Sequence, residues 1–104
     1  MDTPELLAQI KARLQAAHGA RLKGVILYGS RARGDAQPGS DWDVLVVLEG
    51  PIHLMRDIHT TTVALYPLVL ELGILIDAIP ADSRAFESQD YALYHVAKAE
   101  GIPA

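Results

Sequence analysis

Two aspartates, Asp41 and Asp43, stand two residues apart at the start of an apolar run, in the segment SDWDVLVVL. Side chains two residues apart on a strand point to the same face, so this spacing predicts two neighbouring carboxylates. Two negative charges so close together disfavour ionisation unless a cation neutralises both. Magnesium suits such a pair, because it takes hard oxygen ligands and is usually held by one or two carboxylates together with substrate phosphates.

A third carboxylate, Asp77, lies in the middle of another apolar run, ILIDAIP. An aspartate without a partner is costly inside a strand. If the two apolar runs form neighbouring strands, Asp77 completes a three-carboxylate cluster with Asp41 and Asp43. Taken singly, Asp41 could cap a turn and Asp77 could be a hydrogen-bonded acid of the core. Nothing distinctive flanks Asp77, and Glu71 is the alternative third carboxylate.

Gly29 and Ser30 follow a short apolar run and open a predicted short helix, SRARGDA. Free amides at the start of a helix bind anions, and glycine lets a phosphate come close to the backbone. The hydroxyl of Ser30 adds one more donor. Of the two arginines that follow, Arg33 is favoured over Arg31 as a phosphate ligand. An ordinary strand-to-helix turn with solvated arginines would explain these residues if they stood alone.

The elements that must position these residues alternate between helices and strands. Thr3 as a hydroxyl N-cap, followed by Pro4, marks the beginning of the first helix. Pro80 is expected to end the last strand. Apolar spacing predicts helices over 4–18, 51–66 and 88–101, and strands over 23–28, 41–49 and 74–80.

The second predicted helix contains weaker signals than the first. Its inward face is expected to carry Leu54, Ile58 and Leu65, with Thr61 and Thr62 as further candidates. Three successive threonines disfavour a helix slightly, and Pro67 is expected to kink or interrupt it before LVLELG closes it.

Composition limits the classes of function. The net charge of −4 argues against broad binding of nucleic acid, which needs clustered Lys and Arg. The absence of cysteine excludes disulfides, zinc-thiolate sites and thiol nucleophiles. No signal peptide or membrane span is predicted, so a cytoplasmic protein is expected. The element order predicts one domain over 1–104, an α/β or α+β fold with a small mixed sheet of three or more strands flanked by helices.

The segment GSRARGDAQPGSDWDVLVV resembles the signature of the minimal nucleotidyltransferases, the small branch of the polymerase-β-like nucleotidyltransferase superfamily. The resemblance implies the polymerase-β-like fold and a role for each motif residue. Gly29 and Ser30 would hold the triphosphate of a nucleotide such as ATP. Asp41 and Asp43 would ligate two Mg²⁺ ions, and Asp77 would join one of them. An acceptor hydroxyl, deprotonated near Asp77, would attack the α-phosphate and release pyrophosphate.

The resemblance also implies a biological setting. Proteins of this kind often pair with a small helical HEPN toxin, which they adenylylate, commonly on a tyrosine, and so act as antitoxins. The prediction is therefore a protein adenylyltransferase that acts as an antitoxin. Two alternatives stay open: a non-catalytic antitoxin that neutralises its partner by contact, and a nucleotidyltransferase for a small-molecule acceptor completed by a homo-oligomer.

Few residues outside the motif suggest a further role. Tyr91, Tyr94 and Val96 are a candidate face for a partner in a homo- or hetero-oligomer, although an aromatic stripe at helical spacing is more often part of a core. The four histidines show no metal-ligand pattern and are interpreted as incidental: His18, His53, His59 and His95.

Overall fold

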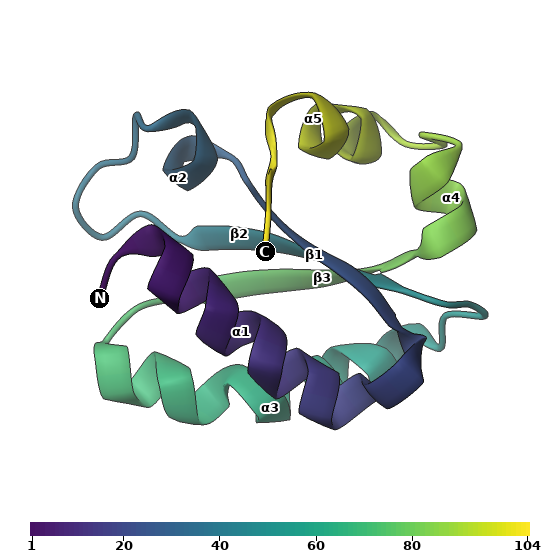
Figure 1. The fold of residues 1–104 in the computed structure, drawn as a ribbon, viewed down its shortest axis with the longest axis horizontal. Helices are drawn as coiled ribbons and strands as arrows, with labels where there is room; N and C mark the ends of the chain where they lie inside the picture. Colours follow the sequence, from purple (N-terminus) through teal and green to yellow (C-terminus); the bar gives the residue numbers. More distant parts are fainter.

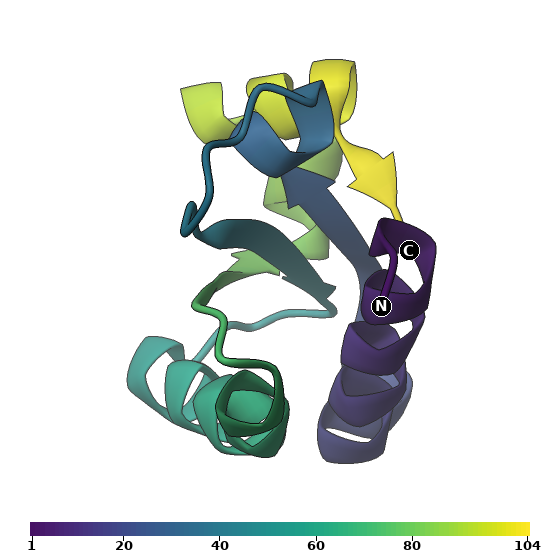
Figure 2. The same ribbon diagram turned by 90° about the vertical axis from the view of Figure 1, so that its left-hand side faces the viewer.

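The sheet lies between two layers of helices in the computed structural model, which describes residues 1–104 (Figure 1). Two long helices cover one face, and three short helices cover the other (Figure 2). The elements, in chain order, are α1 (Thr3–His18), the 3-10 turn η1 (Gly19–Arg21), β1 (Leu22–Tyr28), α2 (Ser30–Arg33), β2 (Trp42–Leu48), α3 (Leu54–Leu72), β3 (Ile76–Asp82), α4 (Ser83–Glu87), α5 (Ala92–Glu100) and β4 (Ile102–Pro103).

The four strands form a mixed sheet in the order β3-β2-β1-β4. β1 pairs antiparallel with β2 and with β4, whereas β2 and β3 are parallel. Parallel neighbours need a crossover connection, and α3 provides it. The predicted mixed sheet is therefore confirmed, and β2 and β3 are neighbours, which was the condition for Asp77 to approach Asp43.

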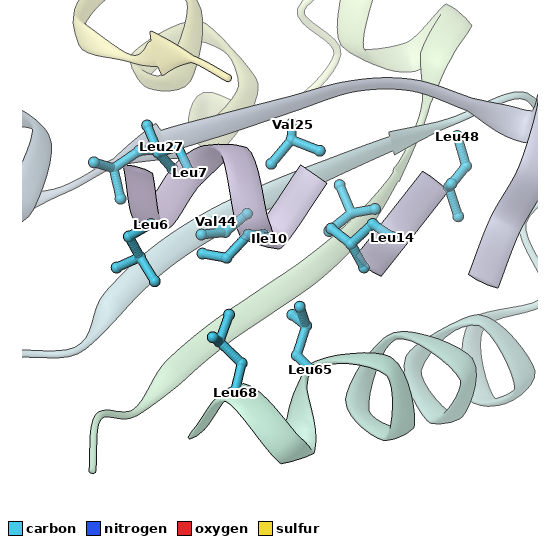
Figure 3. Packing of buried hydrophobic residues seen from close by; sticks show 11 residues of the cluster. Leu6, Leu7, Ile10, Leu14, Val25, Leu27, Val44, Leu48, Leu65 and Leu68 are labelled. Carbon is cyan, nitrogen blue, oxygen red and sulfur yellow. The ribbon is translucent and has the colours of Figure 1, made fainter. Parts of the chain in front are cut away.

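The strands bury side chains on both faces, as the continuous apolar run of β2 predicts. The lower face in Figure 1 packs against α1 and α3, and Figure 3 shows this core. Its eleven buried residues are Leu6, Leu7, Ile10, Leu14, Val25, Leu27, Val44, Val46, Leu48, Leu65 and Leu68. The upper face carries a smaller core beneath α4 and α5, of Tyr28, Leu45, Val47, Ala81, Phe86 and Ala97.

A buried ion pair joins the end of η1 to α3. The Arg21 guanidinium donates to both carboxylate oxygens of Asp57, at 2.8 and 3.1 Å, and the amide of His53 donates to the same carboxylate. Only 2% of the Asp57 side chain is exposed. The hydrogen bond from Arg21 lowers the pKa of Asp57 to about 2. Asp57 thus fixes the first turn of α3 against the loop that precedes β1.

The helices differ from the sequence predictions at their ends and on one face. α1 is capped by Asp2, whose carboxylate accepts a hydrogen bond from the amide of Glu5, and not by Thr3. α3 runs through Pro67 without ending. Because proline has no N–H, the carbonyl of Val63, four residues earlier, loses its usual hydrogen-bond donor. Val63 is exposed, so water can donate that hydrogen bond instead.

The buried face of α3 contains Leu65 and the candidate Thr61, as predicted, but also Asp57, which was not predicted. Leu54 is 57% exposed and Ile58 38% exposed, while Asp57 and Thr61 are buried. Thr61 is within hydrogen-bond distance of the His18 ring, at 2.9 Å, and Asp57 is paired with Arg21. The partner of Asp57 lies 36 residues away in the sequence, so helical periodicity could not reveal its burial.

The C-terminal part also differs from the prediction. β3 continues through Pro80 to Asp82, and this is tolerated because β3 is an edge strand, where a missing N–H need not break the sheet. The last helix, predicted over 88–101, is the shorter α5, and α4 before it was not predicted. After α5 the chain adds a short strand, β4, to the edge of β1. None of the helices is both long and apolar enough to cross a membrane.

Candidate active site

Three side chains form one row across the sheet. Tyr28 on β1 is paired with Asp43 on β2, and Asp43 is paired in register with Asp77 on β3. Paired residues on neighbouring strands point to the same face, which here is the face of the smaller core, where Tyr28 packs with Phe86 of α4 and Ala97 of α5. The predicted neighbourhood of Asp43 and Asp77 is therefore present, and Tyr28 joins them without having been predicted.

The row concentrates negative charge that no cationic side chain neutralises. Burial raises the pKa of Asp43, and the charges of Asp77 and Asp41 raise it further. The four salt bridges of the structure involve neither Asp41, Asp43 nor Asp77. Burial raises the pKa of Tyr28 to about 12, and the negative charges of Asp43 and Asp77 add to this rise. The Tyr28 hydroxyl therefore stays protonated and can donate a hydrogen bond to an anion.

Asp41 lies one residue before β2 and is exposed. It is close enough to raise the pKa of Asp43, but no group of three or more acidic or histidine side chains is placed to hold a metal ion by itself. Glu71 belongs to α3, which covers the opposite face of the sheet (Figure 2). Any cation at this site would therefore need further oxygen ligands, from water or from a substrate, in addition to the carboxylates.

Gly29 connects β1 to α2 directly beside Asp43. Its backbone angles, φ 75° and ψ −157°, belong to a region that is essentially restricted to glycine. A Cβ atom at this position would lie 2.5 Å from Oδ2 of Asp43. The absence of a side chain therefore lets the turn that opens α2 approach the carboxylate closely, and Ser30 follows as the first residue of that helix.

Gly29→Ala is expected to disrupt this contact. The backbone strain should cost about 1–3 kcal/mol of unfolding free energy, and displacement of Asp43 should lower any activity of the site about 100-fold. Thermal unfolding and rate measurements on the purified variant check both effects. Gly34→Ala is the matched control, because Gly34 also has a positive φ, 83°, but open space around its Cα. Equal activity losses in the two variants would contradict the role given to the Gly29–Asp43 contact.

The two arginines of α2 have different surroundings. Arg33 is 45% exposed and forms ion pairs with Asp35 at 3.2 Å and with Glu100 at 2.9 Å. Its charge also slightly favours the ionised form of Asp43. Arg31 instead contacts the backbone before Asp41. The two carboxylate partners of Arg33 use Nε and Nη1, and a guanidinium has five N–H donors, so Nη2 remains able to bind a phosphate.

The carboxylates lie at the surface: Asp41 and Asp77 are exposed, and Asp43 is half-buried. None of the five hollows on the molecule is lined by Ser30, Asp43 or Asp77. The largest, about 470 Å³, lies between α1 and β4. A ligand at Asp43 and Asp77 would therefore remain accessible to a large second molecule.

Comparison with known proteins places this arrangement in context. The profile of the nucleotidyltransferase domain family matches residues 7–95. A curated protein from Methanocaldococcus jannaschii, provisionally named protein adenylyltransferase MJ0604, is 28% identical over 95 residues, which are 91% of this chain and 89% of that protein.

Two solved structures share the fold. One, provisionally assigned as a minimal nucleotidyltransferase, is 31% identical and superposes with a TM-score of 0.63 over 100% of this chain and 97% of its own. The other, a toxin–antitoxin complex with AMP-PNP, has a TM-score of 0.68 at 18% identity, covering 93% of this chain and 70% of the other. The predicted fold class is thus confirmed.

Proposed function

The chain belongs to the nucleotidyltransferase domain family, and from this we propose that it transfers AMP from ATP to a hydroxyl group of a partner protein. The observation that carries the proposal is the contact between Gly29 and the carboxylate of Asp43, which itself lies in register with Asp77. This contact places a backbone turn suited to phosphate next to carboxylates suited to a cation.

The residues of the site fit magnesium. Asp41, Asp43 and Asp77 provide hard oxygen donors, and no Lys or Arg side chain forms an ion pair with them. In this proposal Asp41 and Asp43 would hold two Mg²⁺ ions, and Asp77 would contribute to one of them. Bound magnesium would neutralise charge on the attacking and leaving oxygens.

The protein residues orient the reactants and receive the proton. Gly29 and Ser30, with Arg33 as a further ligand, hold the triphosphate so that its α-phosphorus faces the row of Asp43 and Asp77. The acceptor oxygen forms a bond to that phosphorus as its proton passes toward the carboxylate of Asp77. The bond to the bridging oxygen breaks, and pyrophosphate leaves with the electron pair. In-line geometry of this kind is chiefly a matter of positioning.

A protein acceptor is favoured by the relatives and by the open site. The M. jannaschii relative is provisionally named a protein adenylyltransferase, and one structural neighbour is a toxin–antitoxin complex. A surface site without enclosing walls suits a hydroxyl carried on another folded protein. We propose that the acceptor is a tyrosine of a helical HEPN-type toxin, and that its modification is the antitoxin activity.

Incubation with α-labelled ATP and Mg²⁺, with and without a helical HEPN-type protein whose gene adjoins the gene of this protein, tests the proposal. Intact mass should show the gain of one adenylyl group on the neighbour. A tight complex without transfer would instead indicate an antitoxin that acts by contact. Transfer only to a small molecule would replace the protein acceptor by a small-molecule acceptor.

Ser30→Ala is expected to weaken the use of ATP more mildly than changes at the carboxylates. Loss of one hydrogen bond to a charged phosphate, about 1.5 kcal/mol, corresponds to a rise of about tenfold in KM for ATP. Steady-state kinetics measure this, with Ser88→Ala as a control at an exposed serine in the turn after α4. An unchanged KM for ATP would show that Ser30 does not contact the phosphates.

A further inference from the structure

Arg31 contacts both residues that flank Asp41. Its Nε and Nη2 atoms donate to the carbonyl oxygen of Ser40, at 3.3 and 3.0 Å. Its guanidinium carbon lies 4.6 Å from the centre of the Trp42 ring. The Arg31 side chain therefore holds the backbone of Ser40, just before Asp41, and packs over the ring of Trp42, just after it.

These contacts connect the two halves of the site. Arg31 belongs to the same short helix as Ser30, whereas Trp42 begins β2 and carries Asp43 as its neighbour. The amide of Trp42 donates to the carbonyl of Leu75 at 2.9 Å, two residues before Asp77. A continuous set of contacts thus runs from α2, through Arg31 and Trp42, to the start of β3.

We propose that Arg31 is a positioning residue, which sets the distance between the turn at Gly29 and the segment of Asp41 to Asp43. The inference rests on the proposed function, since it assigns Arg31 a part in that same site. The Nε and Nη2 edge of a guanidinium is one of the edges that can bind a carboxylate or phosphate with two hydrogen bonds. In Arg31 this edge is occupied by Ser40, so its role differs from that of a phosphate ligand.

The kinetic test separates positioning from phosphate binding. Arg31→Ala is expected to lower kcat about 100-fold through misplacement of Asp41 and Asp43, to raise the Mg²⁺ concentration needed for half-maximal transfer, and to leave KM for ATP nearly unchanged. Arg31→Lys should recover only part of kcat, because a lysine cannot reproduce the forked hydrogen bonds or the stacking. A raised KM with normal kcat, or full activity of Arg31→Lys, would overturn the proposal in favour of phosphate binding.

Hydrogen exchange provides a readout that does not depend on catalysis. In Arg31→Ala, the amides of residues 35–43 should exchange faster than in the unmodified protein, whether or not any acceptor is modified. Unchanged exchange there would overturn the proposal even if transfer were lost. Conversely, failure of the unmodified protein to transfer AMP, with faster exchange in the variant, would reject the proposed function alone.

Lys98→Ala is the matched control. Lys98 of α5 also combines a backbone carbonyl, that of Glu87 at 3.3 Å, with an aromatic ring, that of Phe86 at 5.1 Å, but both partners belong to α4 and not to the site. This variant should retain kcat and the exchange rates of residues 35–43. An equal loss of kcat in Lys98→Ala and Arg31→Ala would show a general effect on stability and overturn the assignment.

Discussion

Asp43→Asn is expected to reduce AMP transfer by about 1000-fold or more, an effect on the scale of removing a central electrostatic contact from an active site. Asparagine keeps the size of the side chain but removes its charge. Asp43 lies between Gly29 and Asp77, so the proposed cation would lose the ligand closest to both the phosphate turn and the third carboxylate. Single-turnover transfer at saturating ATP and Mg²⁺ measures the loss.

The same variant should be at least as stable as the unmodified protein. Asp43 has a pKa raised above its ordinary value of 3.8, so its contribution to stability is present below that value and is lost as the pH rises through the folded-state pKa. At pH 7 the charged form opposes folding, and asparagine removes that opposition. Asp90→Asn, an equal change of charge on an exposed side chain, is the control. Undiminished transfer by Asp43→Asn would refute the proposed metal site.

Arg21→Met is expected to have the largest effect on stability, a loss of about 3–5 kcal/mol. The substitution leaves the carboxylate of Asp57, only 2% exposed, without its cationic partner. Because native domains are stable by only about 5–15 kcal/mol, this is a large part of the total. Asp57→Asn should cost less, since Arg21 is 32% exposed and can be hydrated when it loses its partner. Denaturant unfolding at pH 7 compares the two variants.

The stability of the unmodified protein and that of Arg21→Met should change with pH in opposite directions. In the unmodified protein the pKa of Asp57 is lowered to about 2, so its stabilising contribution is present above 3.8 and is lost as the pH falls toward 2. In Arg21→Met the unpaired, buried carboxyl should have a raised pKa, and the variant should gain stability as the pH falls below 7. Lys98→Met, which breaks an exposed pair with Glu87, should cost less than about 1 kcal/mol. If Arg21→Met lost no more unfolding free energy at pH 7 than Lys98→Met, this would contradict a structural role for the pair of Arg21 and Asp57.

Sequence reasoning succeeded where short-range patterns determine the outcome. The strand that ends before Gly29 and the strand that contains Asp43 could both be identified from apolar runs and their flanking turns. The approach of Asp43 and Asp77 depended on these two strands being neighbours, which the sequence left as a condition and which the parallel pairing of β2 and β3 fulfils. The catalytic roles given to these residues are predictions that the kinetic experiments must test.

The remaining features depend on contacts that no local pattern records. Asp57 is buried because it meets Arg21, 36 residues away, and an aspartate in a helix is ordinarily expected to face solvent. Arg31 and Arg33 are nearly equivalent by sequence, yet one bonds to Ser40 and the other to Glu100, 67 residues away. β4 has only two residues, too few to show any periodicity, and its position depends entirely on the exposed edge of β1.

The prolines of the two outer strands affect how molecules of this protein meet one another. Pro80 lies in β3 and Pro103 in β4, so each edge of the sheet contains a residue without an N–H group. Unprotected edges are templates for pairing with strands of other chains, and proline is one of the residues that interrupt such pairing. A chain in which half the residues are hydrophobic is thereby protected at both edges against growth of the sheet into aggregates.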